Sequence, residues 1–318
     1  MKITQRCTVL AVLVSVIAVV TGCSRPAVRP EVRLGYLPIA ECTPLFVAQS
    51  EHLFENHGIK VALTEFEDGP TVIAASLGGS LDGGLSGVVP ILFAAEKDKP
   101  IKMVNDGGHV VPAPHPYVGL VVKASSQIQS VAELKGKTVA VNGLKTLEEG
   151  LLRVALNKAG IGHDVNVVTL PHPNMVQALT SGTIDASMAI EPYISMGLAE
   201  GSIRVLESSD EIIPSFQLSA IFFTNRFIEG SPDALARFTA AYNDAIRFIA
   251  SNPDRAKHIV ADWTKTPLAT ANSMTLPGWS TDLPIEGAKQ VQKAMLENGI
   301  LERAVNLDGF LYKVGTQH

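Results

Sequence analysis

Residues 111–116 read Val-Pro-Ala-Pro-His-Pro, and this stretch marks the point at which we expect the chain to cross between two lobes. Three prolines within five residues disfavour a helix, because proline lacks an amide hydrogen and holds the preceding residue in an extended conformation. The run that follows, Tyr-Val-Gly-Leu-Val-Val-Lys over 117–123, predicts a strand. The crossing therefore continues directly into a second structural unit.

Strand and helix patterns alternate on both sides of this crossing. We expect strands over 32–37, 60–66, 81–85, 101–105, 117–123, 138–142, 165–170, 187–190 and 218–224. We expect helices over 43–57, from 69, and over 88–96, 146–160, 174–181, from 191, and over 232–251, 253–263 and 286–297. Such alternation is typical of parallel α/β sheets.

A short internal repeat indicates that the two units are related. Gly-Ser-Leu-Asp at 79–82 is echoed by Gly-Thr-Ile-Asp at 182–185, and each follows an apolar helix and precedes a short strand. We therefore predict an α/β fold of two similar lobes that are joined by two strands around a hinged cleft. The first lobe is expected to contain residues 31–117 and 222–318, and the second residues 118–221.

The N-terminus predicts export and lipid attachment. Lys2 and Arg6 precede an apolar run, 8–20, that is too short to span a bilayer, which needs roughly 20 apolar residues. This pattern is typical of a signal peptide. Val-Thr-Gly-Cys at 20–23 resembles a bacterial lipobox. We expect residues 1–22 to be removed, Cys23 to carry two or more acyl chains such as palmitate, and residues 23–30 to form a tether.

Charge and cysteine usage narrow the function further. Removal of residues 1–22 takes away two of 26 basic residues and leaves all 31 acidic ones, so the mature chain has a net charge of −7. This charge gives no indication of nucleic-acid binding, which favours clustered basic residues. Cys7 leaves with the leader and Cys23 is acylated. Cys42 is then alone, so an intramolecular disulfide is excluded and the fold must depend on its apolar core.

Several segments, in the same order along the chain, resemble the nitrate, sulfonate, taurine and thiamine-precursor binding proteins of ABC importers. They are Leu-Gly-Tyr-Leu-Pro-Ile from 34, Pro-Leu-Phe-Val-Ala-Gln from 44, Leu-Phe-Glu-Asn-His-Gly-Ile from 53, Leu-Lys-Gly-Lys-Thr-Val-Ala-Val from 134, Ala-Leu-Thr-Ser-Gly-Thr-Ile-Asp-Ala from 178 and Glu-Pro-Tyr from 191. The resemblance implies a type II periplasmic-binding fold, a hinge motion, and delivery of a solute to a permease and its ATPase. It implies no cofactor, no catalytic residue, and a monomer on the extracytoplasmic face of a membrane.

The expected cleft lies beyond the carboxyl ends of the strands, where open α/β sheets bind their ligands. Helix N-termini in that position offer free amide groups and partial positive charge. Four loops, 41–45, 68–71, 86–88 and 142–146, are therefore expected to line it, with Glu191 closing it from the second lobe. The candidate ligand-binding residues are Thr43, Pro44, Gly69, Thr71, Ser86, Gly87, Tyr117, Asn142, Thr146 and Glu191. No metal site is expected.

Four of the side chains near the cleft have a simpler structural interpretation beside the functional one. Thr43 contacts ligand or only caps its helix, and Tyr117 stacks on ligand or only fills the core. Glu191 faces the cleft, as the resemblance implies, or only complements a helix dipole. His115 is interpreted as a loop residue rather than a metal ligand.

The charge of the ligand is left open by the sequence. Helix N-termini favour an anion such as a sulfonate or a nitrate-like ion. If Asp68 and Glu41 face the cleft together with Glu191, an amine or a pyrimidine-type heterocycle is favoured instead. Two other functions also stay open beside the solute receptor. They are a biosynthetic enzyme on the same fold and a lipoprotein that senses ligand for a signalling partner.

Overall fold

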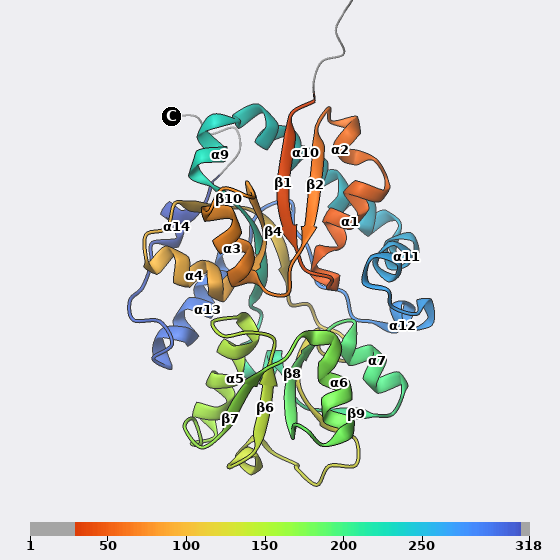
Figure 1. Cartoon of the computed structure of the whole chain (residues 1–318), viewed down its shortest axis with the longest axis vertical. Coiled ribbons are helices and arrows are strands. Elements are labelled where there is room, and N and C mark those ends of the chain that lie inside the picture. Colours follow the sequence, from red (N-terminus) through yellow and green to blue (C-terminus); the bar gives the residue numbers. More distant parts are fainter. Residues whose placement is uncertain (1–28, 313–318) are drawn as a thin grey trace, which may run out of the picture.

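Two five-stranded sheets organise the protein, and the computed structural model describes them within residues 29–312. The predicted leader, residues 1–22, and the lipidation site Cys23 lie outside the described residues. Figure 1 shows the first sheet and its helices above the second sheet and its helices. Within residues 29–312, no helix combines the length and the apolar character that a bilayer crossing requires.

The first sheet has the strand order β2-β1-β3-β10-β4, and the second has the order β7-β6-β8-β5-β9. The strands of the first sheet are β1 (Glu31–Tyr36), β2 (Lys60–Glu65), β3 (Gly83–Gly87), β10 (Gln217–Thr224) and β4 (Ile101–His109). Those of the second are β5 (Val118–Lys123), β6 (Thr138–Val141), β7 (Asn166–Thr169), β8 (Ala186–Ile190) and β9 (Ile203–Ser208). Strands β10 and β5 run antiparallel to both of their neighbours, so the sheets are mixed and not wholly parallel as expected.

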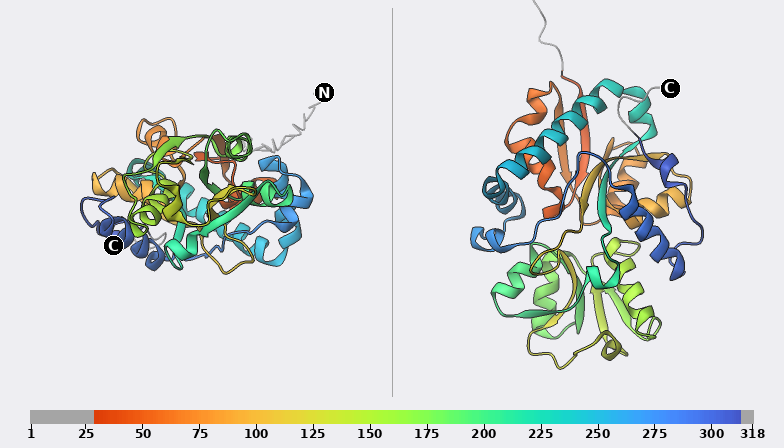
Figure 2. Two further views of the ribbon diagram at one scale, coloured as in Figure 1. Left: turned by 90° about the horizontal axis from the view of Figure 1, so that it is seen from below. Right: turned by 180° about the vertical axis from the view of Figure 1, so that it is seen from behind.

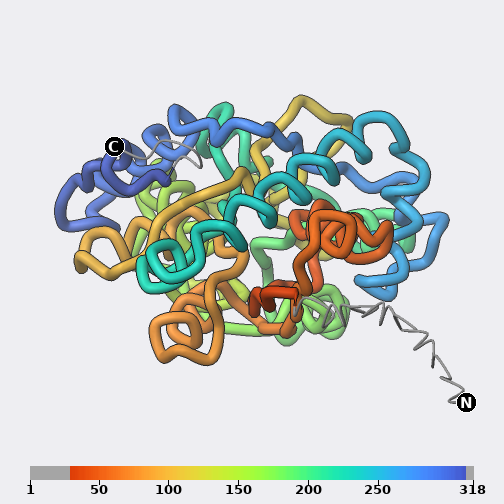
Figure 3. Tube along the Cα trace, turned by 90° about the horizontal axis from the view of Figure 1, so that it is seen from above, coloured from red at the N-terminus to blue at the C-terminus, as the bar shows by residue number. Residues whose placement is uncertain are grey.

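Helices cover both sheets. Around the first sheet lie α1 (Thr43–Ser50), α2 (Leu53–Asn56), α3 (Gly69–Leu77), α4 (Val88–Glu96), α9 (Asn225–Gly230), α10 (Pro232–Ser251), α11 (Pro253–Thr264), α12 (Leu268–Ser273), α13 (Ile285–Glu297) and α14 (Leu307–Phe310). Around the second lie α5 (Leu147–Lys158), α6 (His172–Ser181), α7 (Tyr193–Ala199) and α8 (Ser209–Ile212). Helix α10 runs across the first lobe beside α1 and α2, as Figures 2 and 3 show from behind and from above.

The two sheets repeat one arrangement strand for strand, and the sequence echo occupies the same place in each. The Asp82 carboxylate accepts the amide of Arg33 at 2.9 Å, while its own amide donates to the Arg33 carbonyl at 2.8 Å. The Asp185 carboxylate accepts the amide of Thr138 at 2.9 Å, and its amide donates to the Thr138 carbonyl at 2.9 Å. Each aspartate thus fixes the start of the central parallel strand of its lobe.

Several expected elements have different bounds. The helix expected over 43–57 is divided into α1 and α2, because His52 adopts a left-handed backbone with φ of 56°. Thr43 is the first residue of α1 and not its N-cap, and its hydroxyl donates to the Ala40 carbonyl at 2.5 Å. Strand β3 begins later than expected. It includes Ser86 and Gly87, which the sequence predicts in the loop after the strand. Strand β9 and the short helices α8, α9, α12 and α14 were not predicted.

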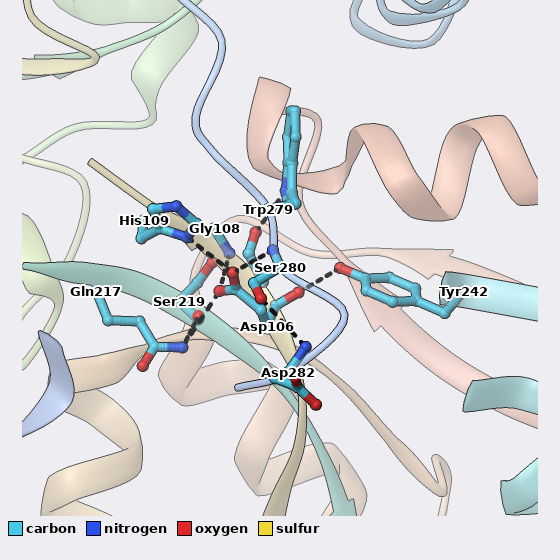
Figure 4. A network of polar contacts seen from close by, with 10 residues as sticks. Asp106, Gly108, His109, Gln217, Ser219, Tyr242, Trp279, Ser280 and Asp282 are labelled. Atoms are coloured by element: carbon cyan, nitrogen blue, oxygen red, sulfur yellow. Dashed lines mark hydrogen bonds and ion pairs between the residues drawn. The ribbon is translucent and has the colours of Figure 1, made fainter. Parts of the chain in front are cut away.

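A buried aspartate fastens the segments that run between the lobes. The Asp106 carboxylate, near the end of β4, accepts the Gly108 amide at 2.9 Å and the Ser280 amide at 2.9 Å. It also lies 2.8 Å from His109 Nδ1 and accepts Gln217 Nε2 at 3.3 Å (Figure 4). Strand β4, the start of β10 and the segment before α13 are therefore held at one point.

A second buried carboxylate, that of Glu191, holds another part of the junction between the two lobes. Glu191 is fully buried after β8, and its oxygens accept the Ser195 amide at 3.0 Å and the Ser195 hydroxyl at 2.8 Å. They also accept the Thr275 amide at 3.1 Å and lie 2.7 Å from His115 Nε2. The side chain of Glu191 thus joins the second lobe to the proline-rich crossing and to the segment after α12.

Candidate ligand-binding cleft

A cavity lies between the lobes where strands β1, β2, β3 and β6 end. Its volume is about 20 Å³, the space of about one water molecule. Its lining residues are Leu37, Ile39, Glu41, Gly69, Leu85, Gly87, Pro90, Asn142, Thr146, Leu147 and Glu148. Each of the four loops expected to line a cleft contributes at least one residue. The cavity therefore lies at the carboxyl ends of strands from both lobes, where α/β proteins bind small ligands.

A second cavity adjoins the first and shares Leu37 and Ile39 with it. Its volume is about 150 Å³, and its lining residues are Leu37, Pro38, Ile39, Glu65, Phe66, Glu67, Pro171, His172, Pro173 and Tyr193. The rings of His172 and Tyr193 stack with their centroids 5.9 Å apart and their planes 13° from parallel. We refer to the two neighbouring cavities together as the cleft.

Two glycines allow the lobes to approach each other. A Cβ atom on Gly87 of the first lobe would lie 3.3 Å from the Leu147 Cβ of the second. A Cβ atom on Gly143 would lie 3.1 Å from Asp68 Oδ2 across the same boundary. A side chain at either position would press on the facing loop by a few tenths of an ångström, so glycine favours close contact between the lobes here.

The helix N-termini at the cleft already have acceptors from the chain itself. Asp68 caps α3, and its carboxylate accepts the Thr71 amide at 2.8 Å and the Thr71 hydroxyl at 2.6 Å. Thr146 caps α5, and its hydroxyl accepts the Glu149 amide at 3.2 Å. Side chains therefore satisfy part of the donor capacity that an anionic ligand would otherwise use.

A carboxyl group in the wall of the first cavity is strongly affected by burial. Glu41 is 3% exposed, and its amide donates to the Tyr117 hydroxyl at 2.9 Å. Burial raises the pKa of Glu41 to about 8. The nearby Ser219 hydroxyl opposes this rise, and the charge of Glu148 adds to it. Glu41 therefore retains its proton at pH 7 in the protein as described.

Glu148 and His172 connect the two cavities. Glu148 is 6% exposed in the first turn of α5, and its Oε1 lies 3.5 Å from His172 Nε2. His172 is 5% exposed, and neither of its ring nitrogens has a hydrogen-bond partner within the described part of the chain. In the same part of the chain, no group of three or more His, Cys, Asp or Glu side chains is arranged to hold a metal ion.

The structure places the candidate residues in two groups. Gly69, Gly87, Asn142 and Thr146 line the first cavity. Ser86 lies directly beside them, since a Cβ atom on Gly69 would collide with the Ser86 hydroxyl oxygen. These five positions lie at the end of β3 and directly after β2 and β6, and they remain the core of the predicted site.

The other candidates are not among the residues that line the two cavities. Thr43 and Pro44 are buried in the first turn of α1, and Tyr117 is 3% exposed. Thr71 is hydrogen-bonded to the Asp68 carboxylate, and the four donors around Glu191 leave its carboxylate inside the junction between the lobes. His115 is the partner of Glu191 and belongs to that junction too.

Three residues line the cleft without being predicted as ligand-binding residues. They are Glu148, His172 and Tyr193. His172 lies between two prolines directly after β7, so the rule that ligands bind beyond strand ends applied to it as well. Glu148 stands in the first turn after the capping residue Thr146, where an acidic residue is commonly explained by the helix dipole alone. The sequence therefore gives no indication that Glu148 lies in the wall of the cavity.

Comparison with known proteins gives consistent relatives. The model of the NMT1-like family matches residues 25–264. A putative aliphatic sulfonates-binding protein of Bacillus subtilis is 30% identical over 269 residues, which cover 80% of this chain and 77% of that protein. An Aspergillus parasiticus protein named 4-amino-5-hydroxymethyl-2-methylpyrimidine phosphate synthase is 26% identical over 67% of this chain and 64% of its own length.

Solved structures share the arrangement of the lobes. The periplasmic aliphatic sulphonate binding protein SsuA of Escherichia coli superposes with a TM-score of 0.72 at 22% identity. The superposition covers 91% of this chain and 94% of that one. The chain therefore has the periplasmic-binding-protein fold that the sequence resemblance implied.

Proposed function

The chain belongs to the NMT1-like family, and we propose on that basis that it is the extracytoplasmic solute-binding component of an ABC-type importer. The observation that carries this function is the cleft itself. Residues from both lobes line it, and they combine apolar side chains with acidic, amide, hydroxyl and imidazole groups. A site built half from each lobe can enclose a small solute when the lobes come together.

Capture would occur by hinge closure. We propose that residues 31–117 and 222–318 move as one body and residues 118–221 as the other. The close approach of Gly87 to Leu147 and of Gly143 to Asp68 in the described structure would belong to the closed arrangement. The Asp106 and Glu191 junctions described above would keep the connecting segments in register during this motion.

The location and partners follow from the same function. A lipid on Cys23 would anchor the protein to a membrane, on its outer face or in the periplasm, with residues 23–30 as a tether. The protein would act as a monomer. From there it would deliver the solute to a permease and its ATPase. The solute would be a small molecule such as a sulfonate, a nitrate-like anion or a pyrimidine-type compound.

Enzymatic activity on the same fold is the second candidate, because one relative bears the name of a synthase. The two functions differ in the fate of the small molecule. A receptor returns its solute unchanged, whereas an enzyme converts it. Mass spectrometry of the small molecule after incubation with the protein separates these outcomes.

Thermal unfolding tests the receptor function. A solute that binds only the folded protein stabilises it by about 2.7 kcal/mol when present at 100 times its Kd. We expect such a shift from at least one compound in a panel of sulfonates, nitrate, bicarbonate, pyrimidines, riboflavin and amines. A panel that leaves the unfolding temperature unchanged would contradict the proposed function.

A further inference from the structure

We propose that the cleft takes a nitrogen compound with cationic or N–H donor groups, such as an amine, an amidine or an amino-substituted heterocycle, and that it disfavours sulfonates. This inference rests on the proposed function and names the ligand class of the same site. The residues that line the two cavities include no lysine or arginine. They include four acidic residues, which are Glu41, Glu65, Glu67 and Glu148.

Two of these acids lie deep in the cleft. Glu41 is 3% exposed and Glu148 is 6% exposed. Across residues 29–312, neither carboxyl group forms an ion pair with a lysine or an arginine, and the basic group beside Glu148 is His172, whose Nε2 atom lies 3.5 Å from Glu148 Oε1. A buried carboxylate is costly unless donors or a positive charge satisfy it. A ligand that brings N–H groups or a cation would supply that partner.

An anionic head group would meet the opposite environment. The Asp68 carboxylate caps α3 beside the cleft, and Glu148 lies in the first turn of α5. These helix N-termini are the positions at which an anion is normally stabilised. Here acidic side chains of the chain itself occupy these positions. A sulfonate would therefore be repelled where other sites of this geometry attract it.

His172 and Tyr193 add a surface suited to a flat ring. Their stacked rings form part of the wall of the second cavity. His172 is only 5% exposed. Neither of its ring nitrogens forms a hydrogen bond within the described part of the chain. An unprotonated imidazole nitrogen accepts N–H donors as a carboxylate does. The aromatic wall and this acceptor together favour an amino-substituted heterocycle within the proposed class.

Matched pairs of compounds test the ligand class by isothermal titration calorimetry on the purified full-length protein. Benzamidine is compared with benzenesulfonate, ethylamine with ethanesulfonate, and 4-amino-2-methylpyrimidine is added as the amino-heterocycle. We expect at least one nitrogen compound to bind at least tenfold more tightly than any of the sulfonates. Because burial raises the pKa of Glu41 to about 8, a bound cation should ionise this group and release a proton. Titrations in buffers of different ionisation enthalpy measure that proton.

Variants locate the effect in the cleft. Glu148→Gln and Glu41→Gln should each weaken binding of the nitrogen compound at least tenfold, because both acids line the first cavity. Glu41→Gln should also abolish proton release. Glu229→Gln is the matched control, because Glu229 is an exposed acid of α9 outside the cleft, and its affinity should stay within twofold of wild type. Circular dichroism checks that each variant is folded. Where Glu148→Gln does not fold, Glu41→Gln alone decides.

Two outcomes would overturn the inference, and they are distinguishable. A sulfonate that binds more tightly than its nitrogen counterpart would leave the receptor function standing and refute the ligand class. Unchanged affinity for the nitrogen compound in both cleft variants would refute it as well. Binding of no compound in either class would count against the solute-binding function and, with it, against this inference.

Discussion

The Nε2 atom of His115 lies 2.7 Å from the Oε1 atom of Glu191, and this contact fastens the proline-rich crossing to the second lobe. Glu191 is fully buried and also accepts donors from Ser195 and Thr275. Three segments that are distant in sequence therefore meet at one carboxylate. The contact links the predicted crossing point to the packing that positions the lobes.

Removal of the Glu191 carboxylate should destabilise the protein strongly. Glu191→Ala leaves the Ser195 and Thr275 amides and the His115 ring without their acceptor in a buried site. We expect a loss of about 2–5 kcal/mol in the free energy of unfolding. Urea denaturation measures it, with Glu229→Ala as the exposed control. A loss below about 0.5 kcal/mol, the range of ordinary surface substitutions, would contradict this role.

The His115–Glu191 contact should make stability depend on pH. The hydrogen bond to Glu191 raises the pKa of His115 above its ordinary 6.5. The contact therefore contributes fully below pH 6.5 and is lost as the pH rises through the higher folded value. Wild type should lose more stability than His115→Gln between pH 6 and pH 9. Parallel pH profiles for the two proteins would show that the contact does not titrate as described.

Burial of Glu41 should also lower stability as the pH rises. Its folded pKa of about 8 exceeds the ordinary value of 4.5, so the unfolded chain loses this proton first and stability falls between pH 4.5 and pH 8. Each pKa unit corresponds to about 1.4 kcal/mol, so the total effect is roughly 3–5 kcal/mol. Glu41→Gln should flatten this part of the profile, measured by urea denaturation from pH 4.5 to pH 9. A variant profile as steep as wild type would disprove it.

Close approach of the lobes should depend on Gly87. Alanine at this position places a Cβ atom 3.3 Å from the Leu147 Cβ on the facing lobe. We expect Gly87→Ala to weaken solute binding about tenfold, or ~1.4 kcal/mol, by opposing closure. Gly230→Ala is the control, because nothing lies within 4 Å of its added Cβ. Calorimetry compares the two, and equal affinities would argue against closure at this contact.

Membrane attachment should depend on Cys23. Cys23→Ala removes the thiol to which the lipid would attach, so uncleaved precursor should accumulate and labelled palmitate should no longer be incorporated. Gel mobility and radiolabelling in the bacterial host measure both effects. The substitution Cys42→Ala serves as the control, since Cys42 is fully buried in the folded protein. Palmitate incorporation that persists in Cys23→Ala would end the lipoprotein interpretation.

The positions of the cleft loops could be predicted because they depend on local order along the chain. Each loop follows a strand, and parallel strands present their carboxyl ends at one edge of a sheet. Gly69, Gly87, Asn142 and Thr146 were found in this way, and all four line the first cavity. The echo of Asp82 in Asp185 is likewise local, and it marked the matching start of a central strand in each lobe.

The chemistry inside the cleft could not be predicted, because it depends on which loops face each other. Glu41 and Glu148 are over 100 residues apart in sequence and contribute to one cavity wall. Thr43 reads equally as a cap or a ligand residue until the Ala40 carbonyl is seen beside its hydroxyl. The sequence allows Glu191 to be a cleft acid or a charge at a helix start, until its partners from two distant segments are known. Tertiary contacts decided each of these cases.

A crystal structure of the protein with the tightest-binding solute of the panel tests the central claim most directly. The account predicts an unmodified solute enclosed between the lobes, in contact with residues of the loops after β1 and β3 and with the start of α5. A solute bound outside the cleft to a single lobe, or one recovered as a converted product, would contradict it.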